Sequence, residues 1–483
     1  MPCYNTPFSN TRALLKRQLT PAFPTCKIYI EKLINIFIKF SIERRENAAL
    51  MNIKRDLYLQ KLISYMWDGQ VKVITGIRRC GKSYLLHTIF QNHLLEQGVP
   101  RDHILSFELD LARDIRYRNP LELAKAVRER VEKQSEPYYL FVDEIQMSDE
   151  AANSYHPAGR TITFYDALND LKSLPNLDIY VTGSNSRMLS SDILTEFRGR
   201  SDEIRVHPLR FSEYYAAVGG EKAEVFEDYA FFGGMPLILS RPDDTSKMNY
   251  LKSLFSEVYL KDIVERKKIR REDILSSTLD LLCSSVGSLT NPNNIANSLN
   301  ARQRRSGENT VSPNTVKSYI GYLADAYLFE ECRRFDVKGK AYFDYPNKYY
   351  CDDMGLRNAR IGFRQQEMTH MMENMIYNDL RIRGCEVDIG IVYGAEKNKA
   401  GQSVQVAREI DFIATRGSKK TYIQSAYALE SEEKACTENK PFSLTGDSFP
   451  KLIVRHDIRR RWYDDTGILN IGILDFLLDD TLV

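Results

Sequence analysis

The stretch that decides the fold is Gly76-Ile77-Arg78-Arg79-Cys80-Gly81-Lys82-Ser83, which follows the apolar run 71–75 directly. It matches the pattern G-x-x-x-x-G-K-[ST] at every fixed position. The two glycines allow the backbone to curl so that successive N–H groups point toward an anion. Lys82 can then reach the β- and γ-phosphates, and the Ser83 hydroxyl can hold Mg²⁺. The pattern predicts a nucleoside triphosphate site; the alternative is a glycine turn followed by Lys-Ser through chance.

Apolar runs rich in β-branched residues recur along the first half of the chain and alternate with segments of helical periodicity. The runs lie at residues 104–109, 138–144, 177–184 and 202–208, and the helical segments lie near 83–97, 121–133 and 164–173. Strands that are apolar throughout and separated by helices of this length are typical of a parallel sheet covered on both faces. We therefore predict one α/β domain over residues 51–210.

Two carboxylates, Asp143 and Glu144, stand at the end of the apolar run 138–142. The carboxyl ends of parallel strands share one edge of a sheet, so Asp143 is expected on the magnesium side of the nucleotide. Glu144 is then placed to orient and polarise the attacking water, which suits a hydrolase better than a kinase. The alternative for Glu144 is a strand-end carboxylate that caps a helix.

Small polar residues and arginines follow the next strand. Ser184 and Asn185 are expected at the same sheet edge, where either side chain could sense the γ-phosphate or its water. Helix capping is an equally open interpretation of Asn185. In the segment 196–200, Arg200 is a candidate for reaching the phosphates of a neighbouring subunit. The alternative is a solvated, ion-paired loop.

Composition limits the classes of protein that fit the chain. Its 483 residues allow about three domains, and its net charge of +2 leaves any nucleic-acid contact to local patches. The eight cysteines form no C-x-x-C pair, which argues against a disulfide scaffold or a zinc site. No apolar run has the 18 or more residues of a membrane span, so we expect a soluble cytoplasmic protein with no membrane partner.

The ends of the chain differ from this α/β region. Residues 1–50 are either a leader with an amphipathic helix near 27–40 or a poorly ordered segment that precedes the natural start at Met51. Residues 211–345 are expected to form a helical lid followed by a winged helix, with helices at 291–300 and 312–328 and a wing turn at 338–340. The chain is again α/β in character over residues 346–483.

Six motifs occur in an order that resembles a group of prokaryotic ATPases of the AAA type: GIRRCGKS, LFVDEIQ, TGSNSRML, FRGR, HPLRFSEY and FFGGMP. In that group the AAA domain precedes a winged helix and a domain similar to restriction endonucleases. The resemblance implies ATP and Mg²⁺ as cofactors, and assembly into a homo-oligomer. It implies catalytic roles for Lys82, Glu144, Asn185 and Arg200 and metal ligation by Ser83 and Asp143. The nucleotide-binding residues would be Gly76, Ile77, Arg78, Arg79, Cys80, Gly81, Lys82, Ser83 and Tyr84.

The C-terminal domain carries part of a nuclease-like site. Glu373 lies in a predicted helix and Asp411 in a predicted strand, but Gln424 stands where such nucleases carry the carboxylate of an E-x-K motif, whose lysine is also missing. An amide is a poor substitute for a carboxylate on a hard cation. We therefore expect an inactive nuclease-like domain in which Glu373 and Asp411 serve hydrogen bonds or a phosphate-facing surface.

Three basic segments offer only limited evidence for nucleic-acid binding. The predicted second helix of the helix-turn-helix carries one cation, Lys317, while the turn before it carries Arg302, Arg304 and Arg305. Phosphate contact by this turn is as plausible as protein contact by the winged helix. We interpret the basic stretches 264–273 and 455–462 as solvated helix faces.

The favoured function is an ATP-hydrolysing switch or motor that couples its nucleotide state to two C-terminal regions, which grip a DNA or protein partner. One alternative is an ATP-gated nuclease. A second is a non-catalytic DNA- or protein-binding module that nucleotide stabilises. We also hypothesise that Lys82 and the helix N-terminus lower the pKa of Cys80, which would make the phosphate loop sensitive to oxidation.

Overall fold

The computed structural model describes residues 53–153, 159, 161–184, 201–303, 310–364, 367–397, 401–429 and 432–483. Residues 53–483 form one compact unit. The leader expected at 1–50 lies outside the described residues, as do Asn185, Arg200, Arg304 and Arg305. Within the described part of the chain, no helix combines the length and apolar character needed to cross a membrane.

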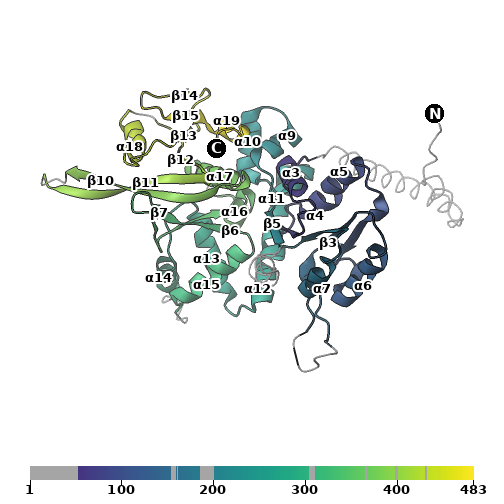
Figure 1. Ribbon diagram of the computed structural model, residues 1–483. Helices are drawn as coiled ribbons and strands as arrows, with labels where there is room; N and C mark the ends of the chain where they lie inside the picture. The colour runs from purple at the N-terminus through teal and green to yellow at the C-terminus, as the bar shows by residue number, and fades with distance from the viewer. Residues whose placement is uncertain are drawn as a thin grey trace, which may run out of the picture. The chain divides into compact units, whose positions relative to one another are not determined.

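The N-terminal region is built on a five-stranded sheet whose neighbouring strands all run parallel (Figure 1). This confirms the predicted α/β sheet. The strand order is β2 (Ile104–Glu108), β3 (Tyr138–Asp143), β4 (Leu177–Thr182), β1 (Val71–Thr75) and β5 (Ser201–Arg205). Strand β4 therefore lies between β1, which leads into the phosphate loop, and β3, which ends at Asp143.

Helices cover both faces of this sheet. On one face pack α3 (Asp56–Ser64) and a continuous helical stretch made of α4 (Lys82–Tyr84), η1 (Leu85–Phe90) and α5 (Gln91–Glu96). On the other pack α6 (Pro120–Val131) and α7 (Phe164–Leu171). The sequence encodes both starts: the Asn119 side chain caps α6, and Thr163 and Asp166 form a capping box for α7.

A helical region follows the sheet. It comprises α9 (Phe211–Val218), α10 (Lys222–Phe232), α11 (Asp244–Ser253), η7 (Leu254–Leu260), α12 (Lys261–Lys267), α13 (Glu272–Ser284), α14 (Pro292–Gln303) and α15 (Pro313–Asp325). Its buried side chains continue the apolar core of the α3 face, so the helices and the sheet share one core. Helices α14 and α15 correspond to the two helices expected near 291–300 and 312–328.

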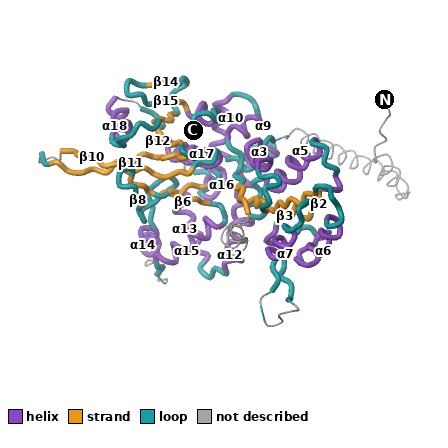
Figure 2. The backbone as a smooth tube through the Cα atoms, in the orientation of Figure 1, coloured by secondary structure: helices purple, strands orange, loops and turns teal. Residues whose placement is uncertain are grey.

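The C-terminal region contains an eight-stranded mixed sheet (Figure 2). Its order is β14 (Trp462–Tyr463), β15 (Leu469–Gly472), β13 (Lys451–Arg455), β12 (Lys419–Ala426), β11 (Ser403–Arg416), β10 (Glu386–Lys397), β7 (Arg334–Asp336) and β8 (Ala341–Tyr342). A separate pair joins β6 (Phe329–Cys332) to β9 (Lys348–Cys351). The helices are α16 (Met354–Arg360), α17 (Met368–Ile382), α18 (Glu432–Ser443) and α19 (Ile473–Leu478).

The structure of this region differs in two ways from the sequence-based predictions, which were a separate wing and a basic helix at 455–462. Strands β7 and β8 form the expected hairpin at 338–340, but β7 also pairs with β10, so the large sheet includes residues on both sides of position 345. The interpretation of 455–462 as a helix face is wrong. Strand β13 ends at Arg455 and β14 begins at Trp462, so the basic residues lie on a loop between two strands.

Candidate functional site

The phosphate loop has a backbone that only glycine accommodates at its first position. Gly76 has a φ of +133°, and a Cβ atom there would lie 2.0 Å from the carbonyl oxygen of Val206. Gly81 has a φ of +103° and immediately precedes the helical stretch that starts at Lys82. Glycine tolerates such φ values without a steric cost. The loop therefore curls tightly against the end of β5 and leads directly into a helix N-terminus.

Lys82 lies inside this loop. Its side chain is 3% exposed, and its Nζ donates to the carbonyl oxygens of Gly76 at 3.0 Å and Ile77 at 3.1 Å. Ser83 and Tyr84 occupy the same first turn of the helix and are half-buried. The Lys82 ammonium group therefore lies within the curl of the loop, where it bonds to two backbone carbonyl oxygens.

Arg55, which directly precedes α3, contacts the backbone of the phosphate loop. Its guanidinium donates to the carbonyl oxygen of Cys80 at 3.3 Å and to that of His207 at 2.7 Å. The same group pairs with Glu213 at 3.1 Å. Arg55 is 3% exposed, so these contacts are shielded from water. No sequence motif identifies Arg55, because it stands outside the glycine-rich pattern; its position directly before a helix is the only local signal.

The helical region holds the other side of the loop. The Tyr259 hydroxyl donates to the carbonyl oxygen of Arg78 at 2.8 Å, and the Arg78 side chain lies 3.4 Å from Asp262. A Cβ on Gly81 would lie 3.8 Å from the ring of Pro236, in the FFGGMP motif. Backbone and side-chain contacts from three segments therefore fix the conformation of the loop.

The hypothesis of a reactive Cys80 is wrong. The thiol is fully buried and donates to the carbonyl oxygen of Val206 at 3.2 Å. Burial raises the pKa of Cys80, and the charges of Lys82 and Arg55 offset only part of that rise. A buried neutral thiol is a poor target for oxidants.

The two carboxylates at the end of β3 have different surroundings. Asp143 is 4% exposed; it accepts a hydrogen bond from the Thr182 hydroxyl on β4, and His87 lies 3.9 Å away. The Thr182 oxygen also accepts the backbone N–H of Glu144 at 3.1 Å. Thr182 thus joins both Asp143 and Glu144 to β4, the strand that lies between β3 and the strand leading into the phosphate loop.

Glu144 itself points to a small polar cluster. Its residue has a φ of +54°, and its side chain does not cap the short turn η4 (Ile145–Met147) that follows. Instead its carboxylate contacts the amide of Gln146 and lies 3.5 Å from the hydroxyl of Ser184, which accepts a hydrogen bond from Gln146 at 3.1 Å. The structure thus brings Glu144 and Ser184 together and adds Gln146, which the sequence analysis did not single out.

Buried and partly buried polar contacts connect the end of β5 to the C-terminal region. The His207 ring lies 2.7 Å from Asp352, which also lies 3.2 Å from Arg205. Arg205 pairs with Glu330 at 2.9 Å, and Arg381 pairs with the same carboxylate at 2.9 Å. Burial opposes the charge of Asp352, but its bonds to His207 and Arg205 hold its pKa below the usual range. Arg205 and His207 flank Val206, whose carbonyl oxygen faces Gly76.

A second buried contact joins the same two regions. Arg210 is 1% exposed and lies 3.0 Å from Asp379 on α17. Its guanidinium also donates to Asp480 at 2.5 Å and to the carbonyl oxygen of Leu477 at 3.2 Å. Removing one partner of such a pair leaves an uncompensated buried charge, which is strongly destabilising. The sequence segment after β5 is therefore fixed to the C-terminal helices.

The nuclease-like residues lie together, but around a lysine. Glu373 on α17 and Asp411 on β11 both face Lys348 of β9, at 2.8 and 3.7 Å, and Glu409 lies 2.8 Å from the same ammonium. The Tyr350 hydroxyl donates to Glu373 at 2.6 Å. Burial, and next the nearby Glu373, raise the pKa of Asp411 to about 8. Lys348 is 4% exposed, so this is an internal ion-pair cluster.

Gln424 lies beside Asp411, on the neighbouring strand β12. Its amide oxygen accepts the backbone N–H of Asp411 at 3.3 Å, and its amide nitrogen donates to Glu438 at 2.9 Å. The sequence predicted that this site lacks a lysine. That is true of β12, but Lys348 reaches Glu373 and Asp411 from β9. Among the residues that the structure describes, no group of three or more His, Cys, Asp or Glu side chains is arranged to hold a metal ion.

Comparisons with known proteins agree with the N-terminal fold. Residues 68–215 match the profile of a family described as an AAA domain, and residues 223–367 match that of a domain of unknown function. An uncharacterized protein of Haemophilus influenzae is 29% identical over 439 residues, covering 88% of this chain and 98% of the relative. An uncharacterized protein of Methanocaldococcus jannaschii is 28% identical over 412 residues, covering 82% and 81%.

Solved structures give weaker likenesses. Cdc6p from Pyrobaculum aerophilum has 13% identity and a TM-score of 0.25, covering 58% of this chain and 89% of that chain. The Aeropyrum pernix Orc1 protein in complex with DNA has 12% identity and a TM-score of 0.26, covering 65% and 96%. Likenesses of this size say nothing about activity. The parallel sheet, the phosphate loop and the matched profile together make residues 68–215 a P-loop domain of the AAA type.

Proposed function

We propose that this protein binds Mg²⁺ and ATP at the phosphate loop, hydrolyses ATP, and passes its nucleotide state to the C-terminal region, which grips a DNA or protein partner. In this proposal Lys82 contacts the β- and γ-phosphates, and Ser83 and Asp143 hold Mg²⁺. Glu144 orients the attacking water, with Ser184 and Gln146 restraining its carboxylate. Magnesium would supply charge neutralisation for the phosphates when bound.

The observation that carries the coupling is the double contact of Arg55. One guanidinium bonds the carbonyl oxygen of Cys80 in the phosphate loop and that of His207. The His207 ring in turn bonds Asp352 at 2.7 Å. If phosphate binding moves the carbonyl oxygen of Cys80, the Arg55 guanidinium would shift with it. That shift would alter the contact of Arg55 with His207, and through His207 the contact with Asp352 in the C-terminal region. Coupling between the phosphate loop and the C-terminal region needs a structural element whose conformation both of them influence, and Arg55 is our candidate for it.

The residues outside the described chain belong to the same proposal. Asn185 would assist Ser184 as a sensor of the γ-phosphate, and Arg200 would act on the nucleotide of a neighbouring subunit in a homo-oligomer. The resemblance to AAA-type ATPases supports these two roles. Nuclease activity is not part of the proposal, because Lys348 occupies the space between Glu373 and Asp411.

The first test is ATP turnover by the full chain, compared with the Glu144→Gln and Lys82→Ala variants, each with and without double-stranded DNA. We expect Glu144→Gln to bind ATP but to lose turnover by about 100-fold or more, and Lys82→Ala to lose binding. Stimulation by DNA would support a DNA partner. Tight ATP binding by the wild type with no turnover under any condition would contradict hydrolysis and favour a nucleotide-stabilised binding module.

A further inference from the structure

The loop between β13 and β14 carries three exposed arginines and leads into two exposed aromatic residues, whose side chains point to opposite faces of β14. Arg459, Arg460 and Arg461 are all exposed, and Trp462 and Tyr463, which follow them, are 43% and 71% exposed. Strand β14 is the edge strand of the eight-stranded sheet.

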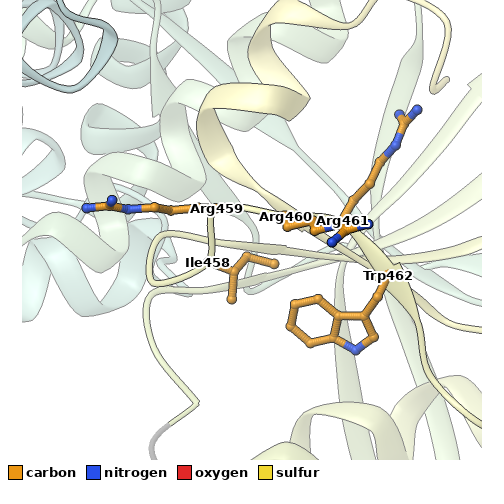
Figure 3. Close-up of a pocket in the computed structure, with 5 residues that line it drawn as sticks. All are labelled: Ile458, Arg459, Arg460, Arg461 and Trp462. Atoms are coloured by element: carbon orange, nitrogen blue, oxygen red, sulfur yellow. The ribbon is translucent and has the colours of Figure 1, made fainter.

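A hollow of about 550 Å³ is formed by the loop residues themselves, which are Ile458, Arg459, Arg460, Arg461 and Trp462 (Figure 3). In this view the Arg459 side chain and the Trp462 indole extend away from the backbone of the loop. Arg455 lies 5.6 Å from the centre of the Trp462 ring and holds one face of the indole. The rest of the ring remains open to a planar ligand.

Three acidic groups near the loop already have partners. Asp457 accepts two hydrogen bonds from Arg455, at 2.9 and 2.7 Å. Asp464 accepts the backbone N–H groups of Thr466 and Ile468 in its own turn. Asp479 pairs with Arg461 at 3.0 Å.

By contrast, neither Arg459 nor Arg460 has an ion-pair partner among the described residues. Two guanidinium groups of this kind beside the open indole of Trp462 favour a ligand that combines anions with flat rings. A single-stranded nucleic acid has this chemistry, because its unpaired bases can stack on side chains while its phosphates meet arginines. A duplex keeps its bases stacked inside, so it could use the arginines but not the indole.

We propose that this arginine-aromatic loop, residues 458–463, binds single-stranded nucleic acid. Arg459 and Arg460 contact successive phosphates, and the Trp462 indole stacks on a base. Because neither ring nor guanidinium distinguishes the sugar, oligo-dT and oligo-rU are expected to bind alike. The inference deepens the proposed function by naming the partner of the C-terminal region, and it rests on that function only for the coupling to ATP.

The chain offers a direct reporter for this contact. It has two tryptophans, Trp67 and Trp462, and Trp67 lies in the N-terminal region, where its indole donates to the Tyr139 hydroxyl at 3.2 Å. In the full-length Trp67→Phe protein, all tryptophan fluorescence therefore comes from Trp462. Titration with oligo-dT of about 20 nucleotides, in the absence of ATP, should quench this signal because a base stacks on the indole.

Affinity is measured in parallel by anisotropy of labelled oligo-dT. The Arg459→Ala/Arg460→Ala variant should bind oligo-dT roughly tenfold more weakly near physiological salt. A plot of log K against log salt concentration should also have a slope that is smaller in magnitude by about 1.4, which is about 0.7 for each lost phosphate contact. The matched control, Arg101→Ala/Arg130→Ala, removes two exposed arginines that form no ion pair within the described N-terminal region. It should leave the affinity unchanged. Neither pair of substitutions removes a buried contact.

Three results would overturn the inference: equal oligo-dT affinity in the two double variants, no quenching of Trp462, or tighter binding of polyglutamate than of oligo-dT. The last would assign the surface to an acidic protein instead. Since these titrations contain no nucleotide, they are independent of ATP turnover. A protein that binds oligo-dT through this loop but does not hydrolyse ATP would retain the inference and refute the proposed function.

Discussion

Arg55 and Glu213 form a buried ion pair in which the guanidinium Nε lies 3.1 Å from the carboxylate Oε1. Glu213 also accepts the backbone N–H of Arg210 at 3.2 Å, so one carboxylate orients both the arginine behind the phosphate loop and the start of α9. Burial raises the pKa of Glu213, and the charge of Arg55 opposes this rise. The pair thus connects the nucleotide site to the segment that docks on the C-terminal helices.

From this pair we predict that Arg55→Lys weakens ATP binding more than it changes the rate of the bound complex. A lysine keeps the charge but cannot bond the Cys80 and His207 carbonyl oxygens and Glu213 together. We expect the apparent KM to rise roughly tenfold or more, since one or two hydrogen bonds to charged groups are lost, while kcat changes little. The control is Arg113→Lys, at an exposed site. An unchanged KM in Arg55→Lys would contradict this positioning role.

Gly76→Ala should abolish nucleotide binding. Its Cβ would meet the Val206 carbonyl oxygen at 2.0 Å, on a backbone φ of +133°. Gly98 is the matched control because it also has a positive φ, of +86°, but a Cβ atom there would meet no other atom within 4 Å. Gly98→Ala should cost about 1 kcal/mol of stability and leave binding intact. Equilibrium binding of a fluorescent ATP analogue distinguishes the two variants; equal affinities would refute the prediction.

Asp353 should make the stability of the fold decrease with rising pH. Burial raises its pKa to about 7, despite hydrogen bonds from the backbone of Leu356 and Gly234, and the neighbouring Asp352 adds to the rise. The folded state then binds a proton that the unfolded state releases near pH 4. The free energy of unfolding therefore falls between about pH 4 and pH 7, and this contribution is fully present only below that window.

The measurement is urea unfolding at several pH values, comparing wild type with Asp353→Asn. The amide retains an oxygen that can accept from Gly234 or Leu356 and removes the titration. The variant should lose part of the pH dependence in this window, while Asp228→Asn, at an exposed carboxylate, should retain it. Identical pH profiles for wild type and Asp353→Asn would contradict the assignment.

Lys348→Met should destabilise the C-terminal region without creating a nuclease. The substitution leaves Glu373, Glu409 and Asp411 without their shared cation, a loss of about 3–5 kcal/mol for a buried pair. Lys440→Met, which removes an exposed partner of Glu396, should cost less than about 1 kcal/mol. Thermal unfolding reports the difference, and divalent-dependent strand cleavage by either variant would revive the nuclease alternative.

Local patterns in the sequence predicted the parts of the molecule that depend on neighbouring residues. The phosphate loop, the apolar strands and the carboxylates at the end of β3 are each recognisable from a short stretch of sequence. Arg55, Gln146 and Lys348 were missed because their roles come from contacts with distant segments. Lys348 stands in the stretch KYYCDD, which matches no metal-binding or phosphate-binding motif. Cys80 was misjudged because sequence shows a cation nearby but not the burial that outweighs it.

The pairing of β7 with β10 has a mechanical consequence for the proposed switch. Strand β7 follows α15 and β6 directly in the chain, and hydrogen bonds join it to the same sheet that carries the arginine-aromatic loop at its far edge. If the proposed switch displaces His207, we expect the helices α13–α15 and this sheet to move together. In the proposed switch, the two C-terminal regions would therefore act on a partner as one body.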